Sequence, residues 1–429
     1  MRKIFALAAG MLACLAHPAV ACEPGLYEPA DGSIKVAVAP LASGEDRYML
    51  TDGRKGTVGA TDALVRCAAG SLLLQEPGGR QDLLSEVPLR RTATTFSSLG
   101  TRLSGVLMEG VDGGTARPLV VMVHGSERTS PRGSVYPLLF LAHGLDVFIY
   151  DKRGTGLSEG EYTQNFELLA EDAAAALREA QRLSAGRHAR IGFYGGSQGG
   201  WVAPLAATRA PADFVAVGFG LVASPIEEDR DQVFTELRER GYDDQVISKA
   251  RDVTNATAAV MRSHFSNGFE QLADVKRRYA DESWFNEIRG EFTGELLRMP
   301  EADLRRLGRA RFDNVELIWD YDSRPAIRTL KVPLLWVAAE ADREAPPAAT
   351  LSRLQDLHAQ GADITVYSFP DTDHGMWEFE EASDGQRTYT RVTDGYFRLI
   401  GDWIRGEVNG PYGRGRLRIG IGSGSDSGR

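Results

Sequence analysis

The sequence has no dense block of lysine and arginine, and its 429 residues carry a formal net charge of −10 at pH 7. Proteins that bind nucleic acid usually neutralise phosphates with a basic patch, so this composition argues against a nucleic-acid partner. Long apolar runs are missing as well. No stretch approaches the roughly 18 continuous apolar residues of a membrane-spanning helix, and we therefore expect no transmembrane segment.

Residues 1–21 have the three-part organisation of a secretory signal peptide. A positively charged start precedes an apolar run over residues 4–16, and small residues at 19–21 form a cleavage site of the A-x-A kind. The apolar run is too short to span a bilayer. We therefore expect an exported protein, periplasmic or secreted, whose mature chain starts at Cys22.

Cysteine is scarce, with only three residues in the chain. Cys14 would be removed with the signal peptide, which leaves Cys22 and Cys67. An even number of cysteines in an oxidising compartment predicts a disulfide between these two. A competing interpretation makes Cys22 a lipid-anchored N-terminus, because residues 20–22 partly match a bacterial lipoprotein cleavage site.

The rest of the chain divides by its hydrophobic pattern. Residues 22–94 contain short β-prone runs separated by turn signals such as Asp31-Gly32, which predicts a small β-rich N-terminal module. Over residues 95–224, and again over 330–407, apolar runs alternate with helical patterns. Strands and helices that alternate at this spacing predict a doubly wound, mainly parallel α/β sheet.

Two segments depart from that alternation. Residues 225–329 are charge-rich and helical throughout, which predicts a helical cap inserted over the carboxyl edge of the sheet. We expect its large aromatic side chains to form the core of the cap rather than to line a pocket. Residues 408–429 are rich in glycine, serine and arginine and are predicted to be a disordered tail. The cap aromatics in question are Trp284, Phe285, Trp319 and Tyr321.

A glycine-flanked serine stands between a predicted strand and a predicted helix. The apolar run that begins at Ile191 leads into Gly195-x-Ser197-x-Gly199, and an alanine-rich segment follows. This spacing is typical of a nucleophile elbow, a turn so tight that only glycine fits two positions either side of the serine. The turn exposes the Ser197 hydroxyl and places the N–H of Gln198 where it can bind an oxyanion. The alternative is a tight turn whose serine has no role.

A serine hydroxyl needs a base to take its proton, and the base is usually a histidine. The chain has only seven histidines, of which His124 and His374 follow directly on predicted strands. His374 lies in a polar loop after the last strand and is the predicted base. His124 is expected to shape its own loop, whose Ser126 would supply the second oxyanion N–H beside that of Gln198.

The carboxylate that orients the base must also lie beyond a strand end. Asp342 follows the strand that ends near Val337, so the predicted triad runs in the chain order Ser197, Asp342, His374, as nucleophile-elbow enzymes require. Glu340 and Glu344 in the same loop are the rival acids.

Taken together, these motifs resemble those of the α/β-hydrolase superfamily, and the chain is most similar to bacterial secreted or cell-envelope hydrolases. The resemblance covers about residues 95–407 and is carried by His124-Gly125-Ser126, by the Asp-x-Arg-Gly-x-Gly-x-Ser loop at 151–158, and by the elbow at 195–199. It implies an α/β-hydrolase fold with a mainly parallel eight-stranded sheet, a Ser-His-Asp triad, and neither cofactor nor metal. Asp151 and Arg153 would brace neighbouring loops.

The resulting hypothesis is a serine hydrolase that cleaves carboxylic esters through an acyl-enzyme. Its partner would be a small-molecule ester, or a short peptide or amide. One alternative is a peptidase or amidase of the prolyl-oligopeptidase-like branch, which uses the same triad. A second alternative is a catalytically inactive binding protein that retains the fold.

Overall fold

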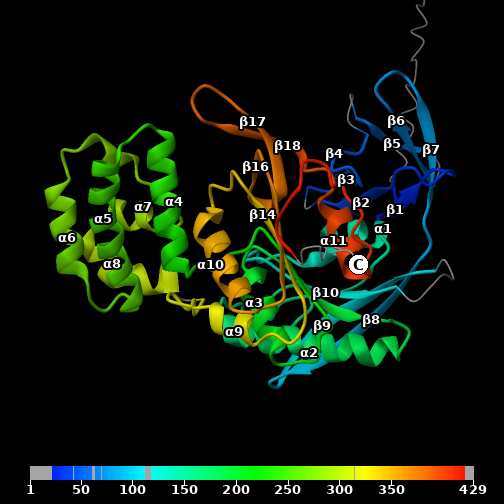
Figure 1. The fold of residues 1–429 in the computed structure, drawn as a ribbon, viewed down its shortest axis with the longest axis horizontal. Coiled ribbons are helices and arrows are strands. Elements are labelled where there is room, and N and C mark those ends of the chain that lie inside the picture. The colour runs from blue at the N-terminus through cyan, green and yellow to red at the C-terminus, as the bar shows by residue number, and fades with distance from the viewer. Residues whose placement is uncertain are drawn as a thin grey trace, which may run out of the picture.

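The computed structural model describes residues 22–41, 43–59, 63–68, 70–111, 117–313 and 315–420. The predicted signal peptide lies outside these ranges. Within them, a small sheet of N-terminal strands lies beside a large central sheet that is flanked by helices (Figure 1). No helix in the described ranges is long and apolar enough to cross a membrane.

The first strands form a seven-stranded antiparallel sheet in the order β4-β3-β2-β1-β7-β6-β5 (Figure 1). Its inward-facing side chains make an apolar core of their own, in which Val36, Leu50 and Leu72 are fully buried. The predicted β-rich N-terminal module is thereby confirmed. The strands are β1 (Gly25–Glu28), β2 (Val36–Pro40), β3 (Asp46–Leu50), β4 (Lys55–Thr57), β5 (Val65–Ala68), β6 (Ser71–Gln75) and β7 (Gln81–Glu86).

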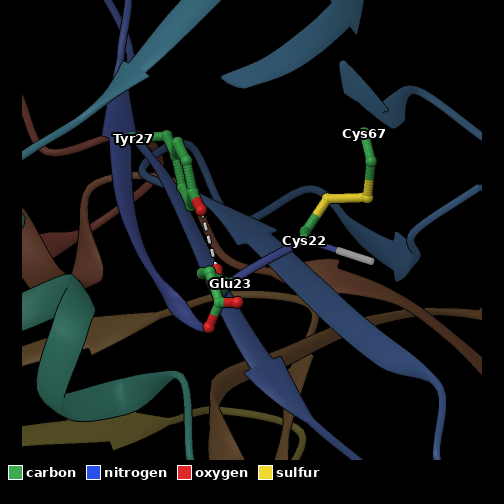
Figure 2. The surroundings of a disulfide bond; sticks show 4 residues. All are labelled: Cys22, Glu23, Tyr27 and Cys67. Atoms are coloured by element: carbon green, nitrogen blue, oxygen red, sulfur yellow. Dashed lines mark hydrogen bonds between the residues drawn. A yellow bond between two sulfur atoms is a disulfide. The ribbon is translucent and has the colours of Figure 1, made fainter. Parts of the chain in front are cut away.

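The predicted disulfide joins the start of this module to β5 (Figure 2). Cys22 and Cys67 are bonded with their Cα atoms 5.4 Å apart, and the hydroxyl of Tyr27 donates to the carbonyl of Glu23 at 2.7 Å beside them. A sulfur in a disulfide has no free valence for a thioether-linked lipid. The structure therefore favours the disulfide over the lipid anchor at Cys22.

We expect the loss of this disulfide to lower the free energy of unfolding by about 4 kcal/mol. The bond closes a loop between residues 45 positions apart, and the chain-entropy model assigns a cost of that size to a loop of that length. The measurement is urea unfolding of mature Cys22→Ala/Cys67→Ala beside the oxidised wild type. Reduction should bring the wild type to the level of the double variant and leave the variant unchanged. Equal unfolding midpoints for all forms would contradict the prediction.

The central sheet has nine strands in the order β19-β15-β14-β13-β12-β10-β11-β9-β8. The six strands in the middle of this order, from β15 to β11, are parallel to one another. The strands at the two edges, β19 on one side and β9 and β8 on the other, are antiparallel to their neighbours. The predicted mainly parallel sheet is confirmed. The strands are β8 (Leu89–Ser98), β9 (Thr101–Gly110), β10 (Leu119–Val123), β11 (Asp146–Tyr150), β12 (Ile191–Gly196), β13 (Val215–Gly218), β14 (Leu334–Ala339), β15 (Ile364–Phe369) and β19 (Arg416–Ile419).

Helices cover both faces of this sheet, which explains why its parallel strands read as continuous apolar runs. Alternate residues of β10 point to opposite faces, so Val121 packs in one core cluster and Val120 in the other. The first cluster also contains α2, α3 and α10, and the second contains α1 and α11. These helices are α1 (Tyr136–Ala142), α2 (Phe166–Ser184), α3 (Gly199–Ala207), α10 (Pro347–Ala359) and α11 (Tyr396–Arg405).

The segment between β13 and β14 is helical, as predicted, and forms a lobe beside α10 (Figure 1). It begins with a capping box, in which the hydroxyl of Ser224 accepts from the N–H of Glu227 and the Glu227 carboxylate accepts from the N–H of Ser224. This cap explains why the helical pattern starts sharply at residue 225. The lobe contains α4 (Pro225–Glu239), α5 (Asp244–Arg262), α6 (Phe269–Arg278), α7 (Thr293–Arg298) and α8 (Glu301–Gly308), and α9 (Arg324–Thr329) leads back to the sheet.

The aromatic side chains of this segment pack inward. Trp284, Trp319 and Tyr321 are buried, and the rings of Trp319 and Phe292 meet edge to face at 5.0 Å. Phe285 is partly buried against the same core. The expected role in the core of the cap is confirmed for Trp284, Phe285 and Trp319. The ring of Tyr321 instead meets that of Phe166 of α2, so this residue packs between the cap and the helices of the sheet.

The prediction of a disordered tail over residues 408–429 is wrong for its described part. Residues 416–419 form β19, which pairs with β15, and Tyr412 is buried with its hydroxyl bonded to Asp402 at 3.0 Å. The edge of β15 offers backbone N–H and C=O groups with which a short strand can pair whatever the composition of the tail around it, so composition alone does not report this strand. The same strand explains why the sheet has nine strands rather than the eight expected. Residues 421–429 lie outside the described ranges.

Two further elements differ from the sequence-based boundaries. Strand β8 begins at Leu89, so the central sheet starts before the boundary placed at residue 94. After β15 the chain forms a three-stranded hairpin sheet before the last helix. Its strands are β16 (Thr372–Asp373), β17 (Trp377–Glu381) and β18 (Arg387–Val392).

Candidate active site

Ser197 occupies the sharp turn between β12 and α3. Its φ of +51° is in the left-handed region that non-glycine residues rarely adopt. A Cβ on Gly195 would lie 2.3 Å from the carbonyl oxygen of Gly199, and one on Gly199 would lie 2.8 Å from that of Val123. Both flanking glycines are therefore required by close backbone approach, which is the physical content of the elbow pattern.

Three predicted residues meet at this turn. The Nε2 atom of His374 lies 3.1 Å from the Oγ atom of Ser197, and its Nδ1 atom lies 2.9 Å from Oδ2 of Asp342. Asp342 is buried, and its other oxygen accepts from the N–H of Ala345 at 2.7 Å. The ring of His374 packs edge-on against Phe219. This arrangement can move a proton from the serine to the histidine while the carboxylate holds the ring.

The topology explains the meeting of segments far apart in sequence. Ser197 follows β12, Asp342 follows β14, and His374 comes after β15. These strands are parallel, so their carboxyl ends lie at one edge of the sheet.

The rival carboxylates do not occupy the position of Asp342. Glu340 turns toward the neighbouring strands, where it accepts from Ser368 at 2.6 Å and pairs with Arg418. Glu344 is half exposed and lies 3.4 Å from Nε2 of His374, on the side of the ring that faces the serine.

The charges around His374 alter its proton affinity. Burial by itself lowers the pKa of His374, but the carboxylate of Asp342 and then those of Glu344 and Glu228 outweigh it and raise the pKa above its ordinary value. The raised pKa means that the protonated ring is stabilised by its neighbours. An imidazolium formed during a reaction at Ser197 would be stabilised in the same way.

The loop after β10 lies against Ser197. A Cβ on Gly125 would be 3.5 Å from that of Ser197. His124 is buried and its Nε2 lies 2.6 Å from the carbonyl oxygen of Tyr150, so this ring is engaged in holding the loop. Its expected role in shaping the loop agrees with this contact.

Two side chains orient the peptide groups of that loop. Lys152 donates from Nζ to the carbonyl of Gly125 at 2.7 Å, and the hydroxyl of Tyr162 donates to the carbonyl of Ser126 at 2.5 Å. In a trans peptide, the C=O group and the N–H of the next residue point in opposite directions. The bond from Lys152 therefore turns the N–H of Ser126 away from Lys152, and Tyr162 does the same for the N–H of Glu127.

The chain also matches a family of known proteins. The family model Hydrolase_4, described as "Serine aminopeptidase, S33", matches residues 114–381, which is more than half of the chain. The chain belongs to this family. The protein is thus a serine hydrolase with the α/β-hydrolase fold, as its motifs predicted. No curated protein matches the hydrolase at a significant level.

Solved structures similar to the hydrolase include esterases and a peptidase. An esterase of Pyrococcus furiosus is 14% identical with a TM-score of 0.40, over 67% of this chain and 84% of the esterase. An acylaminoacyl peptidase of Pyrococcus horikoshii is 16% identical with a TM-score of 0.41, over 79% of this chain and 52% of the peptidase. A bacterial brefeldin A esterase is 17% identical with a TM-score of 0.41, over 70% of this chain and 72% of the esterase.

A cavity of about 730 Å³ opens in front of Ser197 and His374. Its volume suits a drug-sized molecule. Part of its wall comes from the N-terminal sheet, so this module shapes the site of the hydrolase. The apolar wall consists mainly of Pro40, Leu41, Met122, Pro131, Tyr136, Pro137 and Phe219.

One cluster elsewhere has the composition of a metal site. The ligand atoms of Glu109, Asp146 and His188 lie within 4.8 Å of one another. However, Arg90 and Arg187 each bond the Glu109 carboxylate at 2.9 Å. Two guanidinium groups in these positions repel a cation, so the cluster is an ion-pair network.

Sequence reasoning missed the residues that support the site from outside the triad. Lys152 is the second residue after β11. Because β11 pairs with β10, the residues just beyond the ends of these two strands are neighbours. A charged residue just beyond the end of a buried strand was the available signal. Asp151 bonds Arg132 of the segment after β10 at 3.2 Å, which agrees with its expected role as a brace between loops. Arg153 instead pairs with buried Asp172 of α2 at 2.6 Å and so ties its loop to a helix.

Proposed function

We propose that the protein hydrolyses carboxylic esters through an acyl-enzyme on Ser197, with His374 as the base and Asp342 as the residue that orients it. The observation that carries this proposal is the continuous hydrogen-bonded chain from Asp342 through His374 to Ser197, with distances of 2.9 and 3.1 Å. Because Nδ1 of His374 donates to the carboxylate, Nε2 is left as the acceptor for the serine proton.

The reaction follows from this geometry. Nε2 of His374 takes the proton of Ser197 as Oγ attacks the ester carbonyl carbon, and the carbonyl electrons move to its oxygen. The N–H groups of Gln198 and Ser126 are the proposed donors to this oxyanion, and the orientation of the Ser126 peptide by Lys152 supports the second of them.

The second half repeats the proton transfers with water. When the tetrahedral intermediate collapses, His374 gives its proton to the alcohol oxygen and the acyl group stays on Ser197. Water then loses a proton to His374 and attacks the acyl carbon. Collapse of this intermediate returns the proton to Oγ of Ser197 and releases the carboxylic acid.

A second candidate is hydrolysis of aminoacyl amides by the same residues. Glu344 lines the cavity and lies 3.4 Å from Nε2 of His374. Burial, and after it the neighbouring carboxylates, raise the pKa of Glu228 and Glu291, so Glu344 is the carboxylate here whose charge faces the cavity. The negative charge of Glu344 attracts a substrate ammonium. This observation is the reason to test amide substrates beside esters.

The experiment compares short p-nitrophenyl esters with aminoacyl p-nitroanilides on the mature protein, with a fluorophosphonate probe as a third arm. We expect ester turnover and one probe adduct per chain at Ser197. Dominant anilide turnover would favour the second candidate. Absence of turnover and of labelling would contradict the proposal.

In Glu344→Gln, the fall of kcat/KM on the acidic side of the pH profile should occur at lower pH than in wild type, when the substrate is a neutral ester. The base acts only when neutral, so kcat/KM falls as the pH drops below the pKa of His374. Glu344 lies 3.4 Å from Nε2 and raises that pKa, so its removal lowers the pKa and extends activity to lower pH.

The control for this prediction is Glu340→Gln, which removes the same charge from the same loop. Glu340 is paired with Arg418 and does not contact His374. The pH profile of this control should keep its acidic limb. Equal shifts in both variants would mean that the effect is not local to His374.

A further inference from the structure

The cavity in front of Ser197 has a cationic group on the wall that the N-terminal sheet provides. Arg47 of β3 lines the cavity together with Pro40 and Leu41. Its Nη2 atom donates to the carbonyl oxygen of Gly133 at 2.5 Å, which ties the guanidinium to the core of the hydrolase. The position of Arg47 is therefore defined from both sides, by its strand and by this contact.

The protein provides hydrogen-bond acceptors for only some of the N–H groups of Arg47. A guanidinium has five N–H donors, and the bond to Gly133 uses one of them. The Nε atom is buried without an acceptor, and no carboxylate in the described part of the chain forms an ion pair with Arg47. By contrast, Arg54 in the same sheet is paired with both Asp52 and Glu76. A half-buried, unpaired guanidinium is costly unless a ligand or water completes it.

The surroundings of Arg47 restrict what can complete it. Tyr136 lines the same cavity. Burial raises the pKa of its hydroxyl to about 12, and the positive charge of Arg47 opposes this rise, so the guanidinium acts electrostatically on the cavity wall. The carboxylates that line the cavity are Glu344, beside His374, and Glu127, 3.5 Å from the ring of His124. Each of these two carboxylates therefore lies beside a histidine and not beside Arg47. The guanidinium of Arg47 can accordingly bind an anion that enters the cavity.

We propose that Arg47 binds a carboxylate on the substrate, so that the preferred ester has an apolar acyl chain that ends in a carboxylate. Such a chain would lie along the apolar wall of Met122, Pro137 and Phe219 with its ester at Ser197. Arg47 is then a specificity-determining residue supplied by the N-terminal module. This inference rests on the proposed esterase function.

The test compares p-nitrophenyl monoesters of dicarboxylic acids with p-nitrophenyl esters of methyl-ended acids of equal chain length. For wild type we expect a higher kcat/KM on the carboxylate-ended ester, with the greatest preference at one chain length. Arg47→Met should reduce that preference by about 10-fold or more, because a hydrogen bond to a charged group is lost. The readout is the ratio of kcat/KM on the two ester series, and the circular dichroism spectrum and melting temperature of the variant show whether it folds.

Two more variants separate a direct contact from general electrostatics. Arg47→Lys keeps the charge but not the planar fork, so it should retain part of the preference. Arg80→Met removes an exposed charge from the same sheet, outside the cavity lining, and should retain all of it. An equal loss in Arg80→Met would contradict a contact at Arg47, as would an unchanged preference in Arg47→Met.

Two further measurements complete the test. One asks whether the carboxylate lies on the acyl side or on the alcohol side of the ester, and the other applies if the protein hydrolyses no ester. Acyl esters of the phenol oxygen of 4-hydroxybenzoate carry a free carboxylate on the alcohol side. If only these esters show a preference that depends on Arg47, the assignment of the carboxylate to the acyl side is wrong. If no ester is turned over above Ser197→Ala, calorimetric binding of monomethyl suberate remains as a readout. Binding weakened in Arg47→Met would then uphold the carboxylate site without hydrolysis, and equal binding would overturn it.

Discussion

Replacement of Ser197 by alanine should lower kcat for esters on the order of 10⁶-fold, the effect seen when the nucleophile of a comparable triad is removed. The hydroxyl oxygen lies 3.1 Å from Nε2 of His374 and is the nucleophilic atom of the side chain, the one that can accept an acyl group. The oxyanion donors remain in the variant, so a residual acceleration over water should persist. The measurement is kcat on p-nitrophenyl esters together with intact mass after exposure to the fluorophosphonate probe.

The matched control is Ser266→Ala, an exposed serine in the helical lobe. It should keep wild-type turnover and a single probe adduct. A probe adduct on Ser197→Ala, or turnover equal to that of the control, would mean that another residue is the nucleophile.

Asp342→Asn should lower kcat by about 10⁴-fold with little change in stability or KM, since the side chains have nearly the same shape. The carboxylate accepts a hydrogen bond from the Nδ1–H of His374 at 2.9 Å and so leaves Nε2 free to accept from Ser197. An asparagine amide can instead donate to Nδ1, which favours the tautomer with its proton on Nε2. That tautomer has no acceptor for the serine proton.

The measurement for Asp342→Asn is kcat across a pH range, with Asp371→Asn as the control. Asp371 is exposed, lies three residues before His374 and pairs with Arg414, so its variant should keep kcat. A small effect of Asp342→Asn beside a large effect of Glu344→Gln would assign the orienting role to Glu344.

The candidate site was largely predictable because its signals are local. The elbow requires glycine at 195 and 199 wherever such a turn occurs, since a Cβ at either position meets backbone oxygen within 3 Å. His374 and Asp342 were predictable because parallel strands place their following loops at one edge. The choice between Asp342 and Glu340 needed coordinates, which show that Glu340 is engaged by Arg418.

The parts that the sequence did not report depend on partners far along the chain. Strand β19 alternates arginine with aliphatic residues and is largely exposed, and it pairs with the edge that β15 presents. Lys152 acts on a carbonyl 27 residues away, and Arg47 on one 86 residues away. Neither distance leaves a periodic or spacing signal in the sequence.

By itself, the sequence determined the strand–turn–helix at Ser197 and the alternation that builds a parallel sheet, and it left Cys22 and Cys67 as the one possible disulfide pair after removal of the predicted signal peptide. The first two follow from steric and compositional rules that act over a few residues, and the third follows because only two cysteines remain. The tertiary structure alone decided that Asp342 rather than Glu340 contacts His374, that the tail adds a strand, and that the N-terminal sheet brings Arg47 into the cavity. These outcomes depend on which edges and faces pack together, because only packing brings such distant side chains within bonding distance.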